Sequence, residues 1–293
     1  MIFALLLAYS KSFQCLTKFP TSQFLTKRKV SLVAKYFDPP QNSFQTGIAA
    51  IADKMKAESS ESFDIGTGTT VIPVNWAHMD NITNSRAKNI VDHLNDIFTR
   101  NHIPVSFKLN NIMKIMNTTQ ISSDDDEVQN LIYEEYATKE RNVLTVFSVN
   151  SKKDDQYVEG WTVMPMEGNY TDGIFINDNV ITQTDEEIAM ILAHEGGHWL
   201  GLYHTFEGGC KKGPGDYVRD TPQEDNKARQ PNAAGETKSF EWSCNQKVST
   251  CKNGNIDLTN NIMDYTDCKS SYTQGQIYRM MNFVYYRFMG RFP

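Results

Sequence analysis

One stretch constrains this chain more than any other, because residues 194–204 read HEGGHWLGLYH and space three histidines so that they can share one metal ion. His194 and His198 are four positions apart, so on an α-helix they lie on one face about one turn from each other. His204 is six positions further. On the same helix it would be rotated by about 240° and displaced by about 9 Å along the axis. The helix must therefore end before His204.

Gly201 lies where this helix has to end. Glycine adopts the left-handed conformation that terminates helices and turns the chain sharply, so residues 202–204 can fold back toward the metal. Three neutral imidazoles leave one tetrahedral position open, which is typical of a catalytic rather than a structural zinc. Glu195 suits the general base that takes a proton from the attacking water. The alternative is a surface helix whose histidines occur by chance.

The rest of the chain predicts alternating strands and helices. Thr184 is the expected N-cap of the histidine helix, and Glu187, three residues later, completes a capping box. Pro73 indicates that the strand around it is an edge strand or has just begun. From periodicity and apolar runs we expect strands over about 71–76, 105–109, 143–149 and 173–177, and helices over about 44–58, 84–101, from 124 onward, and 274–289.

Three motifs resemble the pappalysin family of metzincin zinc metalloproteases. They are residues 194–210 (HEGGHWLGLYHTFEGGC), residues 218–222 (VRDTP) and residues 261–265 (NIMDY). The resemblance covers roughly residues 70–290. One departure lies inside the helix, where Gly196 replaces the bulkier aliphatic residue that relatives usually carry. A glycine inside a helix costs about 0.5–1 kcal/mol relative to alanine.

The resemblance implies a fold and an activity. The fold would be the α/β (α+β) catalytic domain of metzincins: a twisted mixed sheet with covering helices, followed by an irregular, disulfide-linked C-terminal subdomain. The strand at 173–177 would be the antiparallel edge strand of the cleft, where an extended peptide can pair. The activity would be that of a zinc-dependent endopeptidase on protein or peptide substrates. A catalytically silent zinc-binding relative that acts as a binding protein is the alternative.

The resemblance also assigns roles to single residues. Met263 would form an apolar floor beneath the three histidines without binding the metal. Tyr265 would lie beside the zinc and donate a hydrogen bond to the oxyanion of the reaction. A calcium ion would bind in the loop after the zinc motif, where Glu207, Asp216, Asp220 and Thr221 offer hard oxygen ligands. Their spacing is not that of an EF-hand, and ordinary loop carboxylates are the alternative.

Four of the five cysteines follow the histidine motif: Cys210, Cys244, Cys251 and Cys268. An even cluster in an irregular region predicts two disulfides and an oxidising compartment, although the residues alone leave three pairings open. The resemblance implies Cys210–Cys251 and Cys244–Cys268. A cysteine-zinc site is the alternative, but the spacing contains no C-x-x-C pair.

The N-terminal part differs in composition from the catalytic part, which we place at residues 66–293. Residues 1–10 are a candidate signal peptide, with a truncated signal or a buried start as the alternatives. Together with sequons at Asn81, Asn117 and Asn169, they predict a secreted protein. Residues 11–65 are either a pro-segment that blocks the active site, as in metzincin zymogens, or a linker. Cys15 could supply a thiolate to the open zinc position, or be an unpaired cysteine.

Charge and hydropathy exclude two classes of partner. The formal net charge is −6, which gives no reason to expect nucleic acid. No apolar run approaches the roughly 18 residues that span a bilayer, so we expect no stable membrane insertion.

Overall fold

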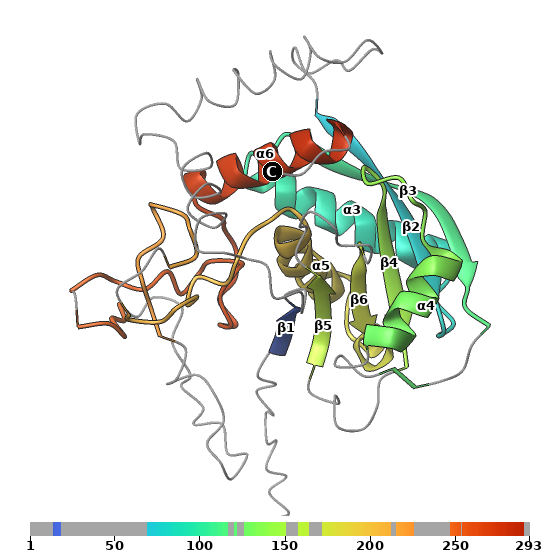
Figure 1. The fold of residues 1–293 in the computed structure, drawn as a ribbon, viewed down its shortest axis with the longest axis horizontal. Coiled ribbons are helices and arrows are strands. Elements are labelled where there is room, and N and C mark those ends of the chain that lie inside the picture. Colours follow the sequence, from blue (N-terminus) through green and yellow to red (C-terminus); the bar gives the residue numbers. More distant parts are fainter. Residues whose placement is uncertain are drawn as a thin grey trace, which may run out of the picture.

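A mixed β-sheet forms the centre of the computed structural model, which describes residues 14–18, 69–116, 120–121, 126–150, 158–163, 172–211, 215–225, 247–252 and 254–289 (Figure 1). Its six strands lie in the order β1-β5-β6-β4-β2-β3. Neighbouring strands are parallel except β5 and β6, which are antiparallel. The strands are β1 (Gln14–Lys18), β2 (Thr70–His78), β3 (Val105–Lys114), β4 (Leu144–Val149), β5 (Val158–Val163) and β6 (Ile174–Asn177).

Helices cover both faces of the sheet. The larger core lies between one face and the helices α3 (Asn84–Arg100), α5 (Asp185–Trp199) and α6 (Gln274–Met289). The smaller core lies on the other face, under α4 (Asp126–Tyr136). Strand β6 shows how one strand serves both cores, because Ile174 and Ile176 belong to the first and Phe175 to the second. The 3-10 helix η2 (Asp178–Thr182) lies in the connection between β6 and α5.

The prediction that residues 173–177 form the antiparallel edge strand is wrong. Strand β6 is parallel to β4 and has β5 on its other side, so it lies inside the sheet. All four of its residues are buried, as expected for a strand covered on both faces. The antiparallel position belongs to β5, whose far side pairs with β1.

Pro73 is the fourth of the nine residues of β2, so it does not begin the strand as its lack of an N–H group suggested. Strand β2 has neighbours on both sides, but its pairing with β4 begins only at Val74. Pro73 therefore lies in the first part of β2, where the strand pairs with β3 alone.

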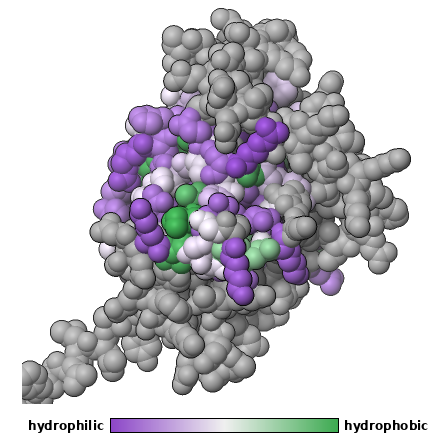
Figure 2. All heavy atoms as spheres, turned by 90° about the vertical axis from the view of Figure 1, so that its left-hand side faces the viewer, coloured by the Kyte–Doolittle hydropathy of each residue, from purple (hydrophilic) through white to green (hydrophobic). Residues whose placement is uncertain are grey.

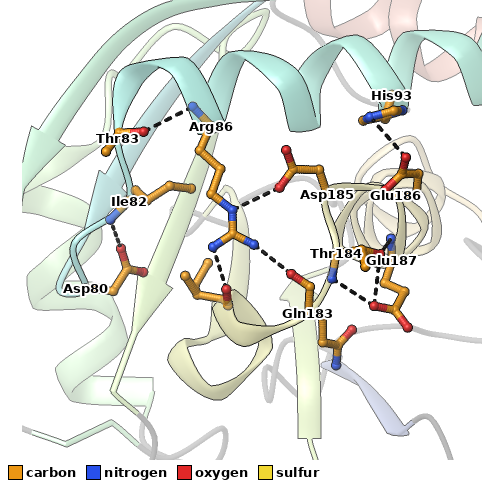
Figure 3. A network of polar contacts seen from close by, with 11 residues as sticks. Asp80, Ile82, Thr83, Arg86, His93, Gln183, Thr184, Asp185, Glu186 and Glu187 are labelled. Carbon is orange, nitrogen blue, oxygen red and sulfur yellow. Dashed lines mark hydrogen bonds and ion pairs between the residues drawn. The ribbon is translucent and has the colours of Figure 1, made fainter.

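The N-terminus of α5 is held by its own cap and by α3. Thr184 accepts a hydrogen bond from the Glu187 N–H at 3.2 Å, and the Glu187 carboxylate accepts one from the Thr184 N–H at 2.8 Å, so the predicted capping box is present. Arg86 of α3 forms an ion pair with Asp185 at 2.9 Å and donates to the Ile181 and Gln183 carbonyls at 2.6 and 2.7 Å (Figure 3). These contacts fix where α5 begins relative to the sheet.

The described chain between α5 and α6 contains no long helix or strand, and a disulfide crosses it. Cys210 and Cys251 are bonded, which confirms the first predicted pair. Cys268 is disulfide-bonded too, while its expected partner, Cys244, lies outside the described residues. On the side of the molecule at the left of Figure 1, the described surface is mainly hydrophilic and surrounds a small hydrophobic area (Figure 2).

Several predictions concern segments that the structure does not describe. The candidate signal peptide, the helix at 44–58, and the sequons at Asn117 and Asn169 all lie outside the described residues. Asn81 is described, and its side chain is exposed. Among the described helices, none combines the length and the apolar character needed to cross a membrane.

Candidate metal centre

The turn after α5 brings the third histidine back to the first two. Gly201 has a φ of +87°, in the left-handed region, as expected. The Gly201 N–H donates to the His198 carbonyl at 2.8 Å, and the Leu202 N–H donates to the Gly197 carbonyl at 2.9 Å. These two bonds form a Schellman motif, which ends the helix and reverses the chain. A side chain at position 201 would also collide with Phe283, because its Cβ would lie 2.3 Å from that ring.

His194, His198 and His204 are buried, and each offers a ring nitrogen within 4.8 Å of the others. The Nε2 atoms of His198 and His204 are 3.1 Å apart. The Nδ1 atom of His194 lies 2.6 Å from the Ile262 carbonyl, and that of His198 lies 2.7 Å from the Leu202 carbonyl. Because a carbonyl can only accept, each Nδ1 carries the hydrogen and each Nε2 presents a lone pair.

Burial keeps these imidazoles neutral. It lowers the pKa of His198 to about 4 and holds the pKa of His194 and His204 well below their ordinary range. The positive charge of Lys269, whose ammonium nitrogen is buried, also lowers the pKa of all three histidines. Neutral imidazole is the form that binds a metal, so the site is ready for a cation without first losing protons.

This set of donors fits zinc. In a tetrahedral zinc site the nitrogens are bound at about 2.0–2.1 Å, which places them roughly 3.3 Å from one another. The observed 3.1 Å between two Nε2 atoms agrees with that geometry. Two of the rings are oriented by backbone carbonyls, as ligand histidines usually are. Three histidines also leave room for a fourth ligand. The predicted zinc cofactor is therefore supported by the residues present.

Met263 lies directly against α5 at Gly197, the residue that precedes the second histidine. A Cβ at Gly197 would lie 2.4 Å from the Met263 sulfur, so only glycine permits this contact. By contrast, no described atom lies within 4 Å of a Cβ built at Gly196. Met263 is fully buried, as expected of an apolar floor. The ring of Tyr265 is half-buried, with its centroid 4.8 Å from the His204 ring and 5.9 Å from the His194 ring.

Glu195 lies against strand β5. It is fully buried, and a Cβ at Gly160 would be only 3.2 Å from the Glu195 Cγ atom. Gly160 therefore lets the antiparallel strand approach the carboxylate that follows the first ligand. Sequence reasoning missed this contact, although a glycine inside a strand often marks a close approach.

Helix α6 supports the centre with polar side chains. Gln276 and Asn261 exchange two hydrogen bonds of 2.8 and 3.0 Å between their amides, and Asn261 in turn accepts from the Met263 N–H at 2.9 Å. Arg279 donates to the Gly201 carbonyl at 2.6 Å. The sequence predicted this helix from the periodicity of its apolar residues. It did not predict which polar residues are buried, because the spacing of a buried polar residue does not distinguish it from a polar residue on the surface.

The predicted calcium ligands have protein partners. Asp216 accepts from the Thr221 hydroxyl at 2.7 Å, and Asp220 accepts from Thr273 and Gly275 at 2.8 and 2.9 Å, at the start of α6. Burial raises the pKa of Asp216 to about 7 and also raises the pKa of Glu207. Among the described residues, the three histidines are the one group of His, Cys, Asp or Glu close enough to share an ion. Calcium binding stays a prediction.

Comparison with known proteins agrees with this geometry. The family described as Peptidase M43, pregnancy-associated plasma protein-A, matches residues 122–285. Extracellular metalloprotease 1 of Coccidioides posadasii is 38% identical over 96 residues, which are 32% of this chain and 30% of that protein. An extracellular metalloprotease of Sordaria macrospora is 34% identical over 138 residues, which are 46% of this chain and 40% of that protein. The matched segments thus span less than half the length of these two relatives.

A solved structure shares the fold. Mirolysin in complex with compound 9 aligns with a TM-score of 0.57 and 23% identity, over 73% of this chain and 90% of that one. The similarity confirms the predicted metzincin-like arrangement of a mixed sheet with covering helices.

Proposed function

Because this chain belongs to the Peptidase M43 family, that of pregnancy-associated plasma protein-A, we propose that it is a secreted zinc endopeptidase acting on proteins or peptides. The observation that carries the proposal is the convergence of three buried, neutral imidazoles beside a buried glutamate. Secretion is supported by the extracellular relatives and by the disulfide between Cys210 and Cys251.

The residues divide the chemistry among them. Bound zinc would supply a Lewis acid that polarises the scissile carbonyl and makes water more acidic. His194, His198 and His204 would hold it. Glu195 would accept the proton of the attacking water and deliver it to the leaving amine. The hydroxyl of Tyr265 would donate a hydrogen bond to the oxyanion as the carbonyl carbon becomes tetrahedral. Glycine at position 160 lets β5 lie close to Glu195.

The central test replaces the proposed base without changing its shape. Glu195→Gln should slow casein cleavage by about 10²–10⁴-fold, the usual contribution of general acid–base catalysis, while bound zinc stays stoichiometric. Tyr265→Phe should slow it by about 10²–10³-fold. Unchanged cleavage by Glu195→Gln would contradict the proposal. A wild type that binds zinc but cleaves no peptide, even after the N-terminal segment is removed, would favour the silent binding protein.

We also propose that residues 11–65 are an inhibitory pro-segment. The support is the pairing of β1, within this segment, along the outer side of β5 in parallel orientation. The backbone of Cys15 is opposite Gly160, the residue that contacts Glu195. A substrate that adds a strand to β5 would need the same N–H and C=O groups. That the Cys15 thiolate reaches the zinc stays a prediction.

Cutting the folded chain tests the pro-segment. A specific protease site introduced between residues 65 and 66 would allow the protein to be cleaved after folding, with an uncut portion of the same preparation as control. Cleavage should raise the rate of peptide hydrolysis strongly and leave the zinc content unchanged. Equal rates before and after the cut would favour the linker.

A further inference from the structure

One buried arginine of α6 contacts the turn that carries the third histidine. Arg279 of α6 is 1% exposed, and its Nε atom donates to the Gly201 carbonyl at 2.6 Å. Its guanidinium carbon lies 5.3 Å from the centre of the Tyr203 ring, immediately before His204. Phe283, one helical turn further along α6, fills the space beside Gly201 and lies 5.6 Å from the same guanidinium. One side chain thus contacts the middle and the last residue of the segment between the second and third ligands, residues 199–203.

Arginine is suited to this position. Its planar group donates through Nε in one direction while its face covers aromatic rings, which a lysine ammonium cannot reproduce. The carbonyls at the C-terminus of a helix carry partial negative charge and lack helical partners, so a cation there is favourable. The hydrogen bond to the Gly201 carbonyl offsets part of the free-energy cost of burying the guanidinium.

The segment that Arg279 holds orients two ligands. His204 lies at its end, and the Leu202 carbonyl within it accepts the Nδ1 hydrogen of His198. We propose that Arg279 is a positioning residue for the metal site, which keeps His204 and the Leu202 carbonyl in place for zinc. This inference rests on the proposed zinc centre, and it assigns Arg279 a role through the Gly201 turn and not as a ligand of the metal.

A second buried arginine on the same helix provides a matched control. Arg287 donates to the Trp199 carbonyl at 2.7 Å and forms a bidentate pair with Asp172 at 2.7 and 3.0 Å. It therefore binds the last residue of α5, whereas Arg279 binds the Gly201 carbonyl in the turn that follows. Replacing it should destabilise the fold at least as much as replacing Arg279, since Asp172 would lose its buried partner.

The experiment compares Arg279→Met and Arg287→Met in the full chain. Zinc affinity is measured by competition with a chromophoric chelator, ligand geometry by the visible absorption of the Co²⁺-substituted protein, and stability by thermal unfolding of the metal-free protein. Arg279→Met should raise the zinc Kd by about 10- to 100-fold, as loss of a group that orients metal ligands typically does, and should alter the Co²⁺ spectrum. Arg287→Met should lower the Tm without changing the Kd more than about threefold.

Zinc affinity that falls in both variants in proportion to their loss of stability, or stays unchanged in Arg279→Met, would overturn the proposal. If Arg279→Met does not fold, Arg279→Lys carries the test, with a smaller rise in Kd expected in the same direction. These measurements need no turnover. A wild type that binds zinc tightly and shows the Arg279 effect, yet cleaves no peptide even after residues 11–65 are removed, would therefore refute the proposed protease function and leave the positioning role intact.

Discussion

Two neighbouring glycines in α5 have opposite requirements. A Cβ at Gly197 would lie 2.4 Å from the Met263 sulfur, whereas a Cβ at Gly196 meets no described atom within 4 Å. Gly196→Ala should therefore raise the free energy of unfolding by about 0.5–1 kcal/mol, because alanine loses less backbone freedom on folding. Gly197→Ala should lower it by about 1–3 kcal/mol, the usual penalty of overpacking. Urea unfolding of both variants measures the difference. A destabilised Gly196→Ala would contradict this account.

Asp216 should make stability depend on pH. Burial raises its folded-state pKa to about 7, above the ordinary value of 3.8, so the folded state binds this proton more tightly than the unfolded state. The stabilisation it provides is complete below the unfolded pKa and is lost as the pH rises toward the folded pKa. Asp216→Asn keeps an acceptor for Thr221 and removes the charge. In calcium-free buffer it should reduce the stability lost between pH 5 and pH 8 by about 2–3 kcal/mol, at about 1.36 kcal/mol per pKa unit.

Unfolding curves at the two pH values measure this effect. An equal loss of unfolding free energy between pH 5 and pH 8 in the wild type and in Asp216→Asn would show that the pKa of Asp216 is not raised. Added calcium tests the calcium prediction, because a calcium site at Asp216 would raise the Tm of the wild type at pH 8 more than that of Asp216→Asn, whose uncharged amide oxygen is a weaker ligand.

At the scale of single residues, the sequence predicted the features that depend on contacts within a few positions of the chain. The sequence HEGGHWLGLYH was enough for the three histidines and the Gly201 turn, because helix periodicity and glycine conformation act within a few residues. Arg279 and Gly160 were not predictable in this way. They reach the site from α6 and β5, through contacts between distant parts of the chain.

At the scale of elements, the N-terminus of α5 contributes to stability, whereas its C-terminal half carries the metal ligands. Thr184 caps its N-terminus, and Thr83 caps α3 with the same hydrogen bond of 3.2 Å. Thr184→Ala and Thr83→Ala should each lower the free energy of unfolding by about 1 kcal/mol. Neither should change zinc affinity, since the ligands lie near the opposite end of α5. Chemical unfolding and chelator competition check both parts. Weaker zinc binding in Thr184→Ala alone would mean that the cap controls the ligand end.

Element type was easier to predict than element position in the sheet. Periodicity located α3 and α6, the histidine motif and its capping box located α5, and apolar runs located β4 and β6. Strand order depends on pairing between distant segments, which no single run encodes. Strands β5 and β6 differ in composition: β6 reads IFIN and is apolar except for the buried Asn177, whereas β5 reads VEGWTV and mixes polar and apolar residues. That contrast could have identified β5 as the antiparallel strand.

At the scale of the whole molecule, strand β1 pairs along the outer side of β5. If residues 11–65 are the inhibitory pro-segment that we propose, access to the site depends on this pairing, and the sheet is completed by residues that a processed enzyme would lose. Exposing β5 would leave an unpaired strand edge beside Glu195, and such an edge is suited to bind an extended peptide. Inhibition and substrate binding would then be alternative uses of one row of hydrogen-bonding groups.

Proline substitutions in β1 test this competition in the uncut chain. Consecutive residues of a strand donate to opposite sides, so only one of the N–H groups of Leu16 and Thr17 points toward β5. Proline at that one of the two positions removes a hydrogen bond to β5, and both Leu16→Pro and Thr17→Pro are therefore made. One lost bond is worth about 1 kcal/mol, which should raise peptide hydrolysis by the uncut protein about three- to tenfold. Leu25→Pro, outside β1, is the control and should leave the rate unchanged. After the segment is cut away, all variants should reach the same rate. Equal rates for all the uncut proteins would mean that the pairing of β1 with β5 does not limit access to the site.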